Sequence, residues 1–188
     1  IKMIYIIDHQ DSFTYNVVHQ FSQFDEVYCT NYFKIDEKKL ANSKIIVFSS
    51  GPGSPKDYLK TSKIYKKFKG KKKIIGICLG FQQILYSEKG LITEQKNIYH
   101  GYQSKIRVTN KSIIFKANKT FLVGRYHSLK LKEPFQSNTI KITMRCTKTE
   151  VAMAFEDIIN NVYGFQFHPE SFLTINGKYI IQKILSFK

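Results

Sequence analysis

Short apolar runs alternate with longer amphipathic segments over the first 90 residues of the chain. The apolar, largely β-branched runs have the length of strands and lie at 3–7, 26–30, 44–49 and 73–77. Between them, 13–24 and 57–68 have the length and polarity of helices, and the polar residues 8–12 offer N-cap side chains to the first helix. Such alternation predicts a mainly parallel sheet with helices on both faces.

After residue 90 the pattern changes to short strands separated by turn residues, without an obvious linker. The expected strands are 104–109, 120–126, 139–145, 151–155 and 162–167, followed by an amphipathic helix from about 176 to 187. This half is expected to pair in an antiparallel or mixed manner. We therefore predict one α/β domain over residues 1–188, with a mixed, mostly parallel central sheet flanked by helices and a smaller antiparallel flank.

The composition is that of a globular chain and excludes several classes of protein. The 188 residues are 43% hydrophobic, enough for a substantial core, and contain no repeat or low-complexity tract. The apolar runs are far shorter than a membrane span, and the opening residues lack a signal-peptide pattern. Three cysteines, a small and odd number, are typical of reduced thiols, so we expect a cytoplasmic protein without a membrane partner.

A formal net charge of +16 raises the question of nucleic-acid binding. Almost all of the positive charge is lysine, since the only arginines are Arg107, Arg125 and Arg145. Specific readers of nucleic acid use arginine for bidentate contacts, and no helix-turn-helix pattern or zinc-ligand spacing accompanies the lysines. We therefore expect no nucleic-acid partner and no metal, and we interpret the lysine content as a compositional bias.

The stretch 73–83 contains a candidate nucleophile, Cys78. Its apolar run leads into Gly-Ile-Cys-Leu-Gly at 76–80 and then into a segment compatible with a helix. Small residues on both sides permit an abrupt turn that pushes out the residue between them, as in the Gly-x-Ser-x-Gly elbow of hydrolases. The first helical turn presents free N–H groups and a partial positive charge, which favour a thiolate. The alternative is that Cys78 is a small buried core residue.

A second expected strand end carries groups that a thiol nucleophile needs. His168, Pro169 and Glu170 follow the strand 162–167. A thiol requires a base within hydrogen-bond reach, and the base requires an acceptor on its other ring nitrogen. Proline at 169 favours an extended turn that can bring Glu170 beside the imidazole of His168. The alternative is a surface turn, but together with the cysteine elbow the catalytic interpretation is favoured.

Four motifs together resemble the class I (triad) glutamine amidotransferases. They are Gly76-Ile77-Cys78-Leu79-Gly80-x-Gln82, Gly51-Pro52-Gly53, Tyr126-His127-Ser128-Leu129 and Gly164-x-Gln166-x-His168-Pro169-Glu170-Ser171. The opening Asp8-x-x-Asp11-Ser12-Phe13-Thr14-Tyr15-Asn16 is similar to that of the glutaminase component (component II) of anthranilate synthase or aminodeoxychorismate synthase. The resemblance covers essentially the whole chain and implies the flavodoxin-like fold of this family.

The resemblance implies a catalytic role for each matching position. Cys78 would attack the side-chain amide of L-glutamine, giving a glutamyl thioester and ammonia. His168 would take the proton of the Cys78 thiol, give a proton to the departing ammonia and then activate the water that cleaves the thioester. Glu170 would hold the imidazole of His168. Backbone N–H groups of Leu79 and Gly53 would form the oxyanion hole.

The resemblance also implies a substrate pocket and a partner contact. The substrate-binding positions would be Gln82, Gly51 and the backbone around Ser128 and Leu129. His100 and Gly101 match a family motif associated with contact to the synthase partner. Without the resemblance, Gln82 would be interpreted as a solvated helix position and 126–129 as an ordinary strand end.

Three positions depart from the family pattern. Phe81 stands where histidine is frequent, Ser50 replaces a proline before the glycine turn, and Tyr102 follows the partner motif where lysine is usual. We expect altered packing around Phe81 with little lost chemistry, a looser oxyanion turn, and a changed partner contact. Cys29 and Cys146 match no motif and are expected to be core residues.

These implications predict a glutaminase subunit that needs no cofactor and delivers ammonia to a separate chorismate-binding synthase subunit (component I). The product would be 4-amino-4-deoxychorismate, on the route to 4-aminobenzoate and folate, or anthranilate, on the route to tryptophan. The sequence leaves both open, with a slight preference for the first.

Two alternatives belong to other classes. One is an amidotransferase subunit that feeds a different acceptor, such as a nucleotide synthetase, and the opening motif argues against it. The other is a non-catalytic binding protein on the same scaffold. The presence of Cys78, His168 and Glu170 argues against that alternative.

Overall fold

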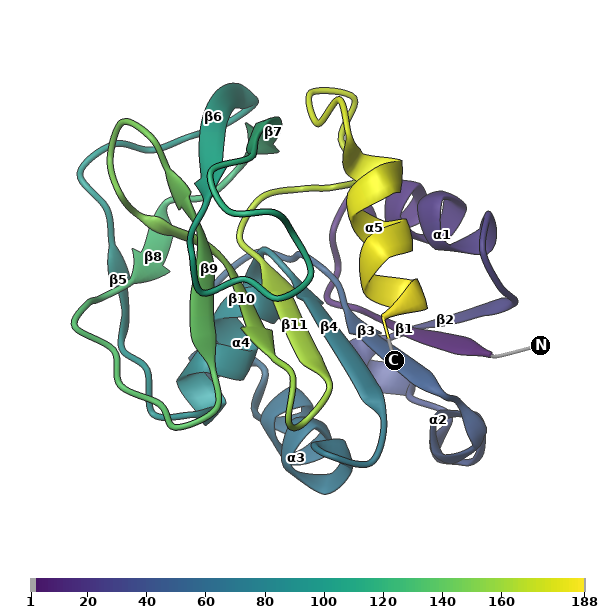
Figure 1. Cartoon of the computed structure of the whole chain (residues 1–188). Helices are drawn as coiled ribbons and strands as arrows, with labels where there is room; N and C mark the ends of the chain where they lie inside the picture. The colour runs from purple at the N-terminus through teal and green to yellow at the C-terminus, as the bar shows by residue number, and fades with distance from the viewer. Residues whose placement is uncertain (1–2, 188) are drawn as a thin grey trace.

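The computed structural model describes residues 3–187, which form a nine-stranded sheet in the order β2-β1-β3-β4-β11-β10-β9-β6-β7 (Figure 1). The parallel strands are β1 (Ile4–Asp8), β2 (Val27–Asn31), β3 (Ile45–Phe48), β4 (Lys73–Ile77) and β11 (Val162–Phe165). The antiparallel strands that continue the sheet are β10 (Ala152–Asp157), β9 (Lys141–Cys146), β6 (Tyr102–Val108) and β7 (Thr120–Arg125). The predicted fold class is confirmed.

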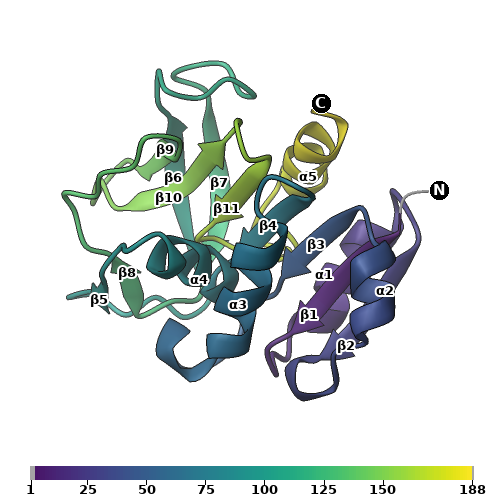
Figure 2. The same ribbon diagram turned by 90° about the horizontal axis from the view of Figure 1, so that it is seen from below.

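Helices cover both faces of the sheet (Figure 2). One face carries α1 (Thr14–Ser22) and α5 (Gly177–Ser186), and the other carries α2 (Glu37–Asn42), α3 (Leu59–Phe68) and α4 (Leu79–Ser87). Side chains that alternate along β1 enter the two cores in turn: Ile4 and Ile6 pack with α1 and α5, and Tyr5 and Ile7 pack with the other helices. This two-sided burial explains why β1, β3 and β4 are nearly continuous apolar runs, whereas the edge strand β2 is only partly buried.

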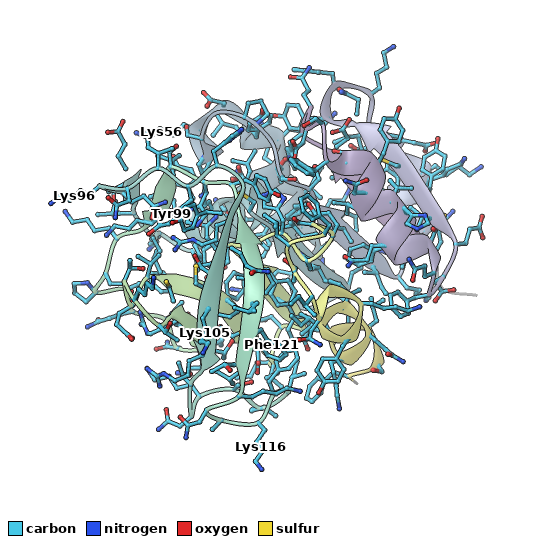
Figure 3. All side chains as sticks on the ribbon, turned by 90° about the horizontal axis from the view of Figure 1, so that it is seen from above. Lys56, Lys96, Tyr99, Lys105, Lys116 and Phe121 are labelled. Carbon is cyan, nitrogen blue, oxygen red and sulfur yellow. The ribbon has the colours of Figure 1, made fainter. Side chains whose placement is uncertain are left out.

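Besides two short 3-10 helices, Tyr32–Lys34 and Pro55–Asp57, three short elements were not predicted from the sequence. They are α2 and the two strands of a second sheet, β5 (Ile92–Glu94) and β8 (Leu129–Leu131). β5 and β8 have three residues each and exist because distant segments pair. The connection from β5 to β6 carries Lys96 and Tyr99, on the same side of the molecule as Lys56 (Figure 3).

The polar turn before α1 does not supply the predicted N-cap. The N-cap is Phe13, which makes no side-chain capping bond. Asp8 Oδ1 instead accepts hydrogen bonds from Gln10 N at 2.8 Å and Thr14 Oγ1 at 2.7 Å. The carboxylate therefore closes the turn after β1, and the helix begins later than the polar residues suggested.

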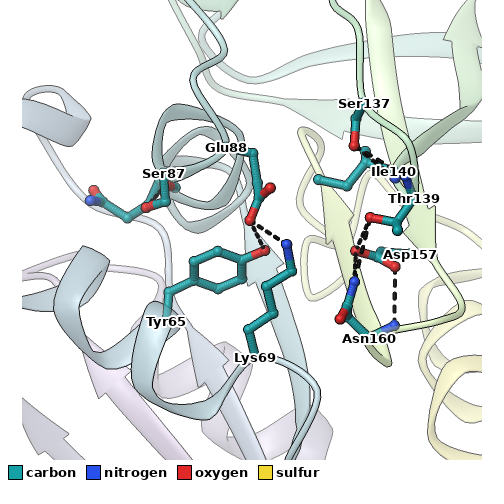
Figure 4. Close-up of polar contacts among 10 residues, drawn as sticks. Tyr65, Lys69, Ser87, Glu88, Ser137, Thr139, Ile140, Asp157 and Asn160 are labelled. Atoms are coloured by element: carbon teal, nitrogen blue, oxygen red, sulfur yellow. Dashed lines mark hydrogen bonds and ion pairs between the residues drawn. The ribbon is translucent and has the colours of Figure 1, made fainter.

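Polar contacts hold the ends of α3 and α4 together (Figure 4). Glu88, directly after α4, accepts hydrogen bonds from Tyr65 Oη at 2.8 Å and Lys69 Nζ at 2.6 Å. A second cluster in the same view joins Thr139 to Asp157 at 2.8 Å. The contacts of Glu88 fix the far end of the helix that begins immediately after Cys78.

The structure can be compared with two predictions: that Cys29 and Cys146 are core residues, and that the apolar runs are too short to span a membrane. Cys146 is buried, whereas Cys29 is only partly buried because β2 is an edge strand, so the core prediction holds fully for Cys146 alone. Within residues 3–187, no helix has both the length and the apolar character needed to span a membrane.

Candidate active site

The predicted site residues follow the carboxyl ends of neighbouring parallel strands. The turn 49–53 follows β3, Cys78 follows β4, and His168 lies three residues after β11. Parallel strands end at one edge of a sheet, and the open edge is where ligands bind in such folds. Strand order thus brings together segments that are distant in sequence.

Cys78 occupies a strained backbone position between β4 and α4. Its φ of 52° and ψ of −99° are unusual for a residue with a Cβ atom. A Cβ on Gly76 would lie 2.5 Å from the carbonyl carbon of Gly80, and a Cβ on Gly80 would lie 2.2 Å from Phe48 O. Both glycines are therefore required by the close approach of α4 to β3 and β4.

The Cys78 thiol is mostly buried but reaches a small cavity. The residue is 7% exposed, and Sγ accepts a contact from Gln166 Nε2 at 3.7 Å. The cavity measures about 180 Å³ and is lined by Gly51, Pro52, Gly53, Cys78, Leu79, Gln82, Tyr126, His127, Ser128 and Leu129. It contains the predicted nucleophile, both predicted oxyanion donors and all predicted substrate-binding positions. A larger hollow of about 820 Å³, between the ends of α3 and α4 and the segment 133–142, contains none of them.

Two residues of the cavity wall, Gly53 and Leu79, carry backbone N–H groups that are free of partners in the described part of the chain. Gly53 has a φ of 79°, and within residues 3–187 no acceptor takes a hydrogen bond from its N–H. Leu79 is the first residue of α4, so its N–H belongs to the helical turn whose donors have no partner inside the helix. Both groups lie beside Cys78.

His168 and Glu170 form a buried hydrogen-bonded pair. His168 Nδ1 lies 2.7 Å from Glu170 Oε1, and their side chains are 2% and 0% exposed. The backbone of His168 is anchored to β7, because its N–H donates to Gly124 O at 3.0 Å. Thr174 Oγ1 donates to His168 O at 2.6 Å, which closes the turn from the other side. The imidazole can therefore rotate little.

The environment of His168 favours its protonated form. Burial alone would lower the pKa of His168, but the charges of Glu170 and Cys78 outweigh it and hold that pKa well above the usual histidine value. Glu170 contacts Nδ1 of His168, whereas Nε2 has no hydrogen-bond partner in the described part of the chain and is left to interact with the neighbouring Cys78 thiol. An imidazolium beside a thiol is an arrangement that stabilises a thiolate.

Two aromatic rings pack edge-on against the imidazole, a contact that was not predicted from the sequence. The ring of Tyr126 lies 4.9 Å from that of His168, and the ring of Phe13 lies 5.5 Å away. Tyr126 Oη is also 3.0 Å from Ser171 Oγ. All three residues lie within the family motifs. This membership is the sequence feature that could have identified them as neighbours of His168.

Gln82 is a buried residue in this structure. The residue is 3% exposed, and its Nε2 donates to Gln166 Oε1 at 3.0 Å and to Leu129 O at 3.3 Å. The interpretation as a solvated helix position is therefore wrong. Gln82 connects α4, the segment after β11 and the start of β8 around the cavity.

The predicted partner residues are exposed and lie close to the site. Gly101 has a φ of 76° and donates its N–H to Arg125 O at 3.0 Å. The ring of His100 lies 6.2 Å from that of Tyr126, which itself contacts His168. Tyr102 is 62% exposed at the start of β6.

The other two departures from the family pattern are buried. Phe81 packs against Phe155 with ring centroids 5.4 Å apart, so its side chain belongs to the core behind the site. Ser50 is 2% exposed, and its carbonyl oxygen accepts a hydrogen bond from Ser49 Oγ at 2.8 Å.

Comparison with known proteins gives consistent results. The family described as "Glutamine amidotransferase class-I" matches residues 5–186. Anthranilate synthase component 2 of Lactococcus lactis subsp. lactis is 37% identical over 189 residues, which cover 98% of this chain and 94% of that protein. Aminodeoxychorismate/anthranilate synthase component 2 of Bacillus subtilis is 32% identical over 186 residues, covering 97% and 95%.

A solved structure shows the same fold. A Thermoplasma acidophilum protein, provisionally described as part of a GMP synthase, superposes with a TM-score of 0.84 at 20% identity, covering 98% of this chain and 92% of that one. At this identity the likeness concerns the fold alone. From the family match over residues 5–186 and the two relatives above 30% identity, the chain belongs to the class-I glutamine amidotransferase family.

Proposed function

We propose that this chain is the glutaminase subunit of a chorismate-aminating synthase. The observation that carries the proposal is the convergence of Cys78 with the His168–Glu170 pair. The thiol lines the cavity, and its charge acts on the buried imidazole that Glu170 holds. Relatives named as component 2 of anthranilate or aminodeoxychorismate synthase support the choice of acceptor.

The proposed reaction has two stages. The Cys78 thiolate attacks the side-chain amide carbon of glutamine, and the C=O electron pair moves onto oxygen. His168 then gives its proton to the amide nitrogen as the C–N bond breaks, so that ammonia leaves and a thioester remains. In the second stage neutral His168 takes a proton from water, the hydroxide attacks the thioester, and glutamate leaves with restoration of the thiolate and imidazolium.

The N–H groups of Leu79 and Gly53 would hold the negative oxygen in both stages. Each such donor is typically worth about 10²–10³ in rate. Glu170 would keep the imidazole in the tautomer and orientation that point Nε2 toward the sulfur. Gln82, Gly51 and the backbone around Ser128 and Leu129 would bind the α-amino and α-carboxylate end of L-glutamine.

The partner proposed for this chain is the chorismate-binding synthase subunit, component I. Large apolar side chains are exposed on segments that follow or border the site, including Tyr15 at 85%, Phe172 at 87% and Ile175 at 68%. His100 packs on Tyr126, and Tyr126 packs on His168, so a protein bound at His100 would contact the surroundings of the base. Delivery across a docked interface would also keep ammonia from being protonated and diluted.

We expect low basal glutaminase activity that rises when the partner binds, because binding selects the ordered form of the site. The test compares glutamine turnover by this chain alone, with the synthase subunit, and with the synthase subunit plus chorismate. A rise of at least about tenfold, the effect of 1.4 kcal/mol, is expected. Equal rates under the three conditions would remove the proposed coupling.

The acceptor is tested by product analysis of the same complex. With chorismate and glutamine, chromatography should detect anthranilate or 4-amino-4-deoxychorismate. The names of the relatives include both pathways, so the proposal covers both products. Transfer of the amide nitrogen to a different acceptor, with neither of these products formed, would overturn it.

A further inference from the structure

The hydroxyl of Tyr58 lies against the glycine turn of the cavity. It donates to Pro52 O at 3.0 Å and lies 3.3 Å from His9 O. Tyr58 is 6% exposed, and its ring packs edge-on against the rings of His9, at 5.0 Å, and Tyr32, at 5.1 Å. Burial raises the pKa of Tyr58, so its hydroxyl keeps its proton and remains a donor at neutral pH.

This contact determines the direction of the next N–H group. A peptide unit is planar and almost always trans, so its C=O and N–H bonds point in opposite directions. When Tyr58 holds the carbonyl of Pro52, the N–H of Gly53 must point away from Tyr58. No residue among 3–187 accepts a hydrogen bond from that N–H, and Gly53 lines the cavity beside Cys78.

The peptide between Pro52 and Gly53 needs such a restraint. Glycine has no Cβ and adopts positive and negative φ almost equally well, so the φ of 79° at Gly53 does not by itself fix the peptide. Asp57 restrains the following residue, because its Oδ2 accepts a hydrogen bond from Ser54 N at 2.7 Å. The carbonyl side of the peptide is restrained by the Tyr58 hydroxyl.

Tyr58 also connects this turn to the helix that carries the other proposed donor. Gln83 Nε2, in α4, donates to Tyr58 O at 3.2 Å. Leu79 begins the same helix. One residue therefore contacts the segments on both sides of the thiol.

We propose that Tyr58 is a positioning residue that aims the Gly53 N–H into the oxyanion hole by holding the Pro52 carbonyl. The inference rests on the proposed glutaminase function and deepens it. Tyr58 touches no reacting atom, so loss of its hydroxyl should act on the stabilisation of the transition state and little on the binding of glutamine.

The primary test is Tyr58→Phe, which removes only the hydroxyl, measured in the complex with the synthase subunit. We expect kcat for glutamine hydrolysis to fall at least about tenfold, part of the 10²–10³ that a lost donor costs, while KM changes less than about twofold. Alkylation of Cys78 by iodoacetamide should keep its rate, because that reaction forms no oxyanion.

The matched control is Tyr32→Phe. Tyr32 belongs to the same aromatic cluster, and its hydroxyl accepts a hydrogen bond from Lys60 N at 3.1 Å, away from the glycine turn. This variant should keep the kcat of the wild type. An equal loss in both variants would mean that the cluster acts through general packing, and would overturn the specific role of Tyr58.

A double-mutant cycle separates positioning from an indirect effect. Gly53→Ala would place a Cβ 2.7 Å from Asp57 Oδ2 at a positive φ, and should displace the same donor. If both changes act on one N–H, the double variant is no slower than Gly53→Ala alone. Additive losses would show that Tyr58 acts elsewhere.

Two outcomes distinguish the proposed role of Tyr58 from the proposed glutaminase function. A wild-type complex that never hydrolyses glutamine refutes the proposed function and the inference with it. An active wild type with an equally active Tyr58→Phe variant refutes only the inference.

Discussion

Arg125 donates a hydrogen bond from Nε to Nε2 of His127 at 3.0 Å, directly behind the loop that lines the cavity. Burial and the charge of Arg125 lower the pKa of His127 to about 3, so the ring is neutral. Because Nε2 accepts from Arg125, Nδ1 carries the proton and donates to Leu129 O at 2.8 Å. The buried guanidinium, stacked 3.6 Å from the Tyr99 ring centroid, therefore helps to hold the proposed glutamine-binding backbone.

This network predicts a binding defect for Arg125→Lys. Lysine cannot reproduce the planar guanidinium, so His127 loses its fixed orientation and the loop 126–129 loosens. We expect KM for glutamine to rise about tenfold, equivalent to 1.4 kcal/mol, with a smaller change in kcat. Arg107→Lys is the control, since the ion pair of Arg107 is an exposed 3.7 Å contact with Glu150. An unchanged KM in a variant shown to be folded by near-UV circular dichroism would contradict this role.

Cys78→Ser should separate glutamine use from ammonia use. A serine hydroxyl at this elbow lacks the nucleophilicity of a thiolate, so glutamine-dependent product formation by the complex should fall by about 10³ or more. Synthesis from added ammonium salt, which bypasses this chain, should stay at the level of the unmodified complex. Retained glutamine-dependent activity would refute the assignment of the nucleophile and favour a non-catalytic scaffold.

Glu170→Gln should lower the pKa of His168. The raised pKa depends in part on the carboxylate charge, which glutamine lacks. Nuclear magnetic resonance of the ¹⁵N-labelled imidazole should show a His168 pKa above the ordinary histidine value in the wild type and a lower pKa in the variant. Because the pKa of His168 is higher in the folded chain than the unfolded value of about 6.5, proton binding by His168 stabilises the fold. This contribution is complete below about pH 6.5 and disappears as the pH rises through the folded pKa. As the pH rises from about 6.5 through the folded pKa, the variant should therefore lose less stability than the wild type.

Two other buried histidines, His9 and His127, should make the fold less stable as the pH is lowered. Burial lowers the pKa of His9 to about 4 and that of His127 to about 3. The unfolded chain binds these protons below about pH 6.5 and the folded chain does not, so stability falls as the pH is lowered. Each residue should contribute a loss approaching about 1.4 kcal/mol per pH unit below its unfolded pKa.

Urea unfolding between about pH 6.5 and 5 measures this effect, because most carboxylates have not yet titrated in that range. His9→Gln should reduce the slope of unfolding free energy against pH, whereas His19→Gln, at an exposed position, should leave it unchanged. A stability that is flat or rises on acidification would contradict the neutral state of the buried rings.

Much of the architecture could be predicted because it depends on local pattern. The runs that became β1, β3 and β4 are apolar throughout most of their length, as expected for strands buried on both faces. Helices α1, α3 and α5 occupy the predicted segments with shifted ends. The predicted capping of α1 was wrong, because Asp8 satisfies backbone and hydroxyl donors in its own turn.

The site was predicted as a set of residues and completed by contacts that no local pattern encodes. The motifs contained Cys78, His168 and Glu170, but the roles of Tyr58 and Arg125 depend on which carbonyl or ring nitrogen each side chain meets. The partners of Gln82 likewise come from Leu129 and Gln166, far away in the sequence.

The order of residues by itself determined where most strands and helices form and which side chains carry the proposed chemistry, because hydrophobic period and glycine spacing act over a few neighbouring positions. Tertiary structure alone decided that β11 inserts beside β4, which brings His168 to Cys78 across 90 positions of the chain (168 − 78). The tertiary structure also decided which buried groups form hydrogen bonds with one another and which carbonyl group of the glycine turn is held by Tyr58. These properties depend on distance and desolvation between segments that meet only when the sheet is assembled.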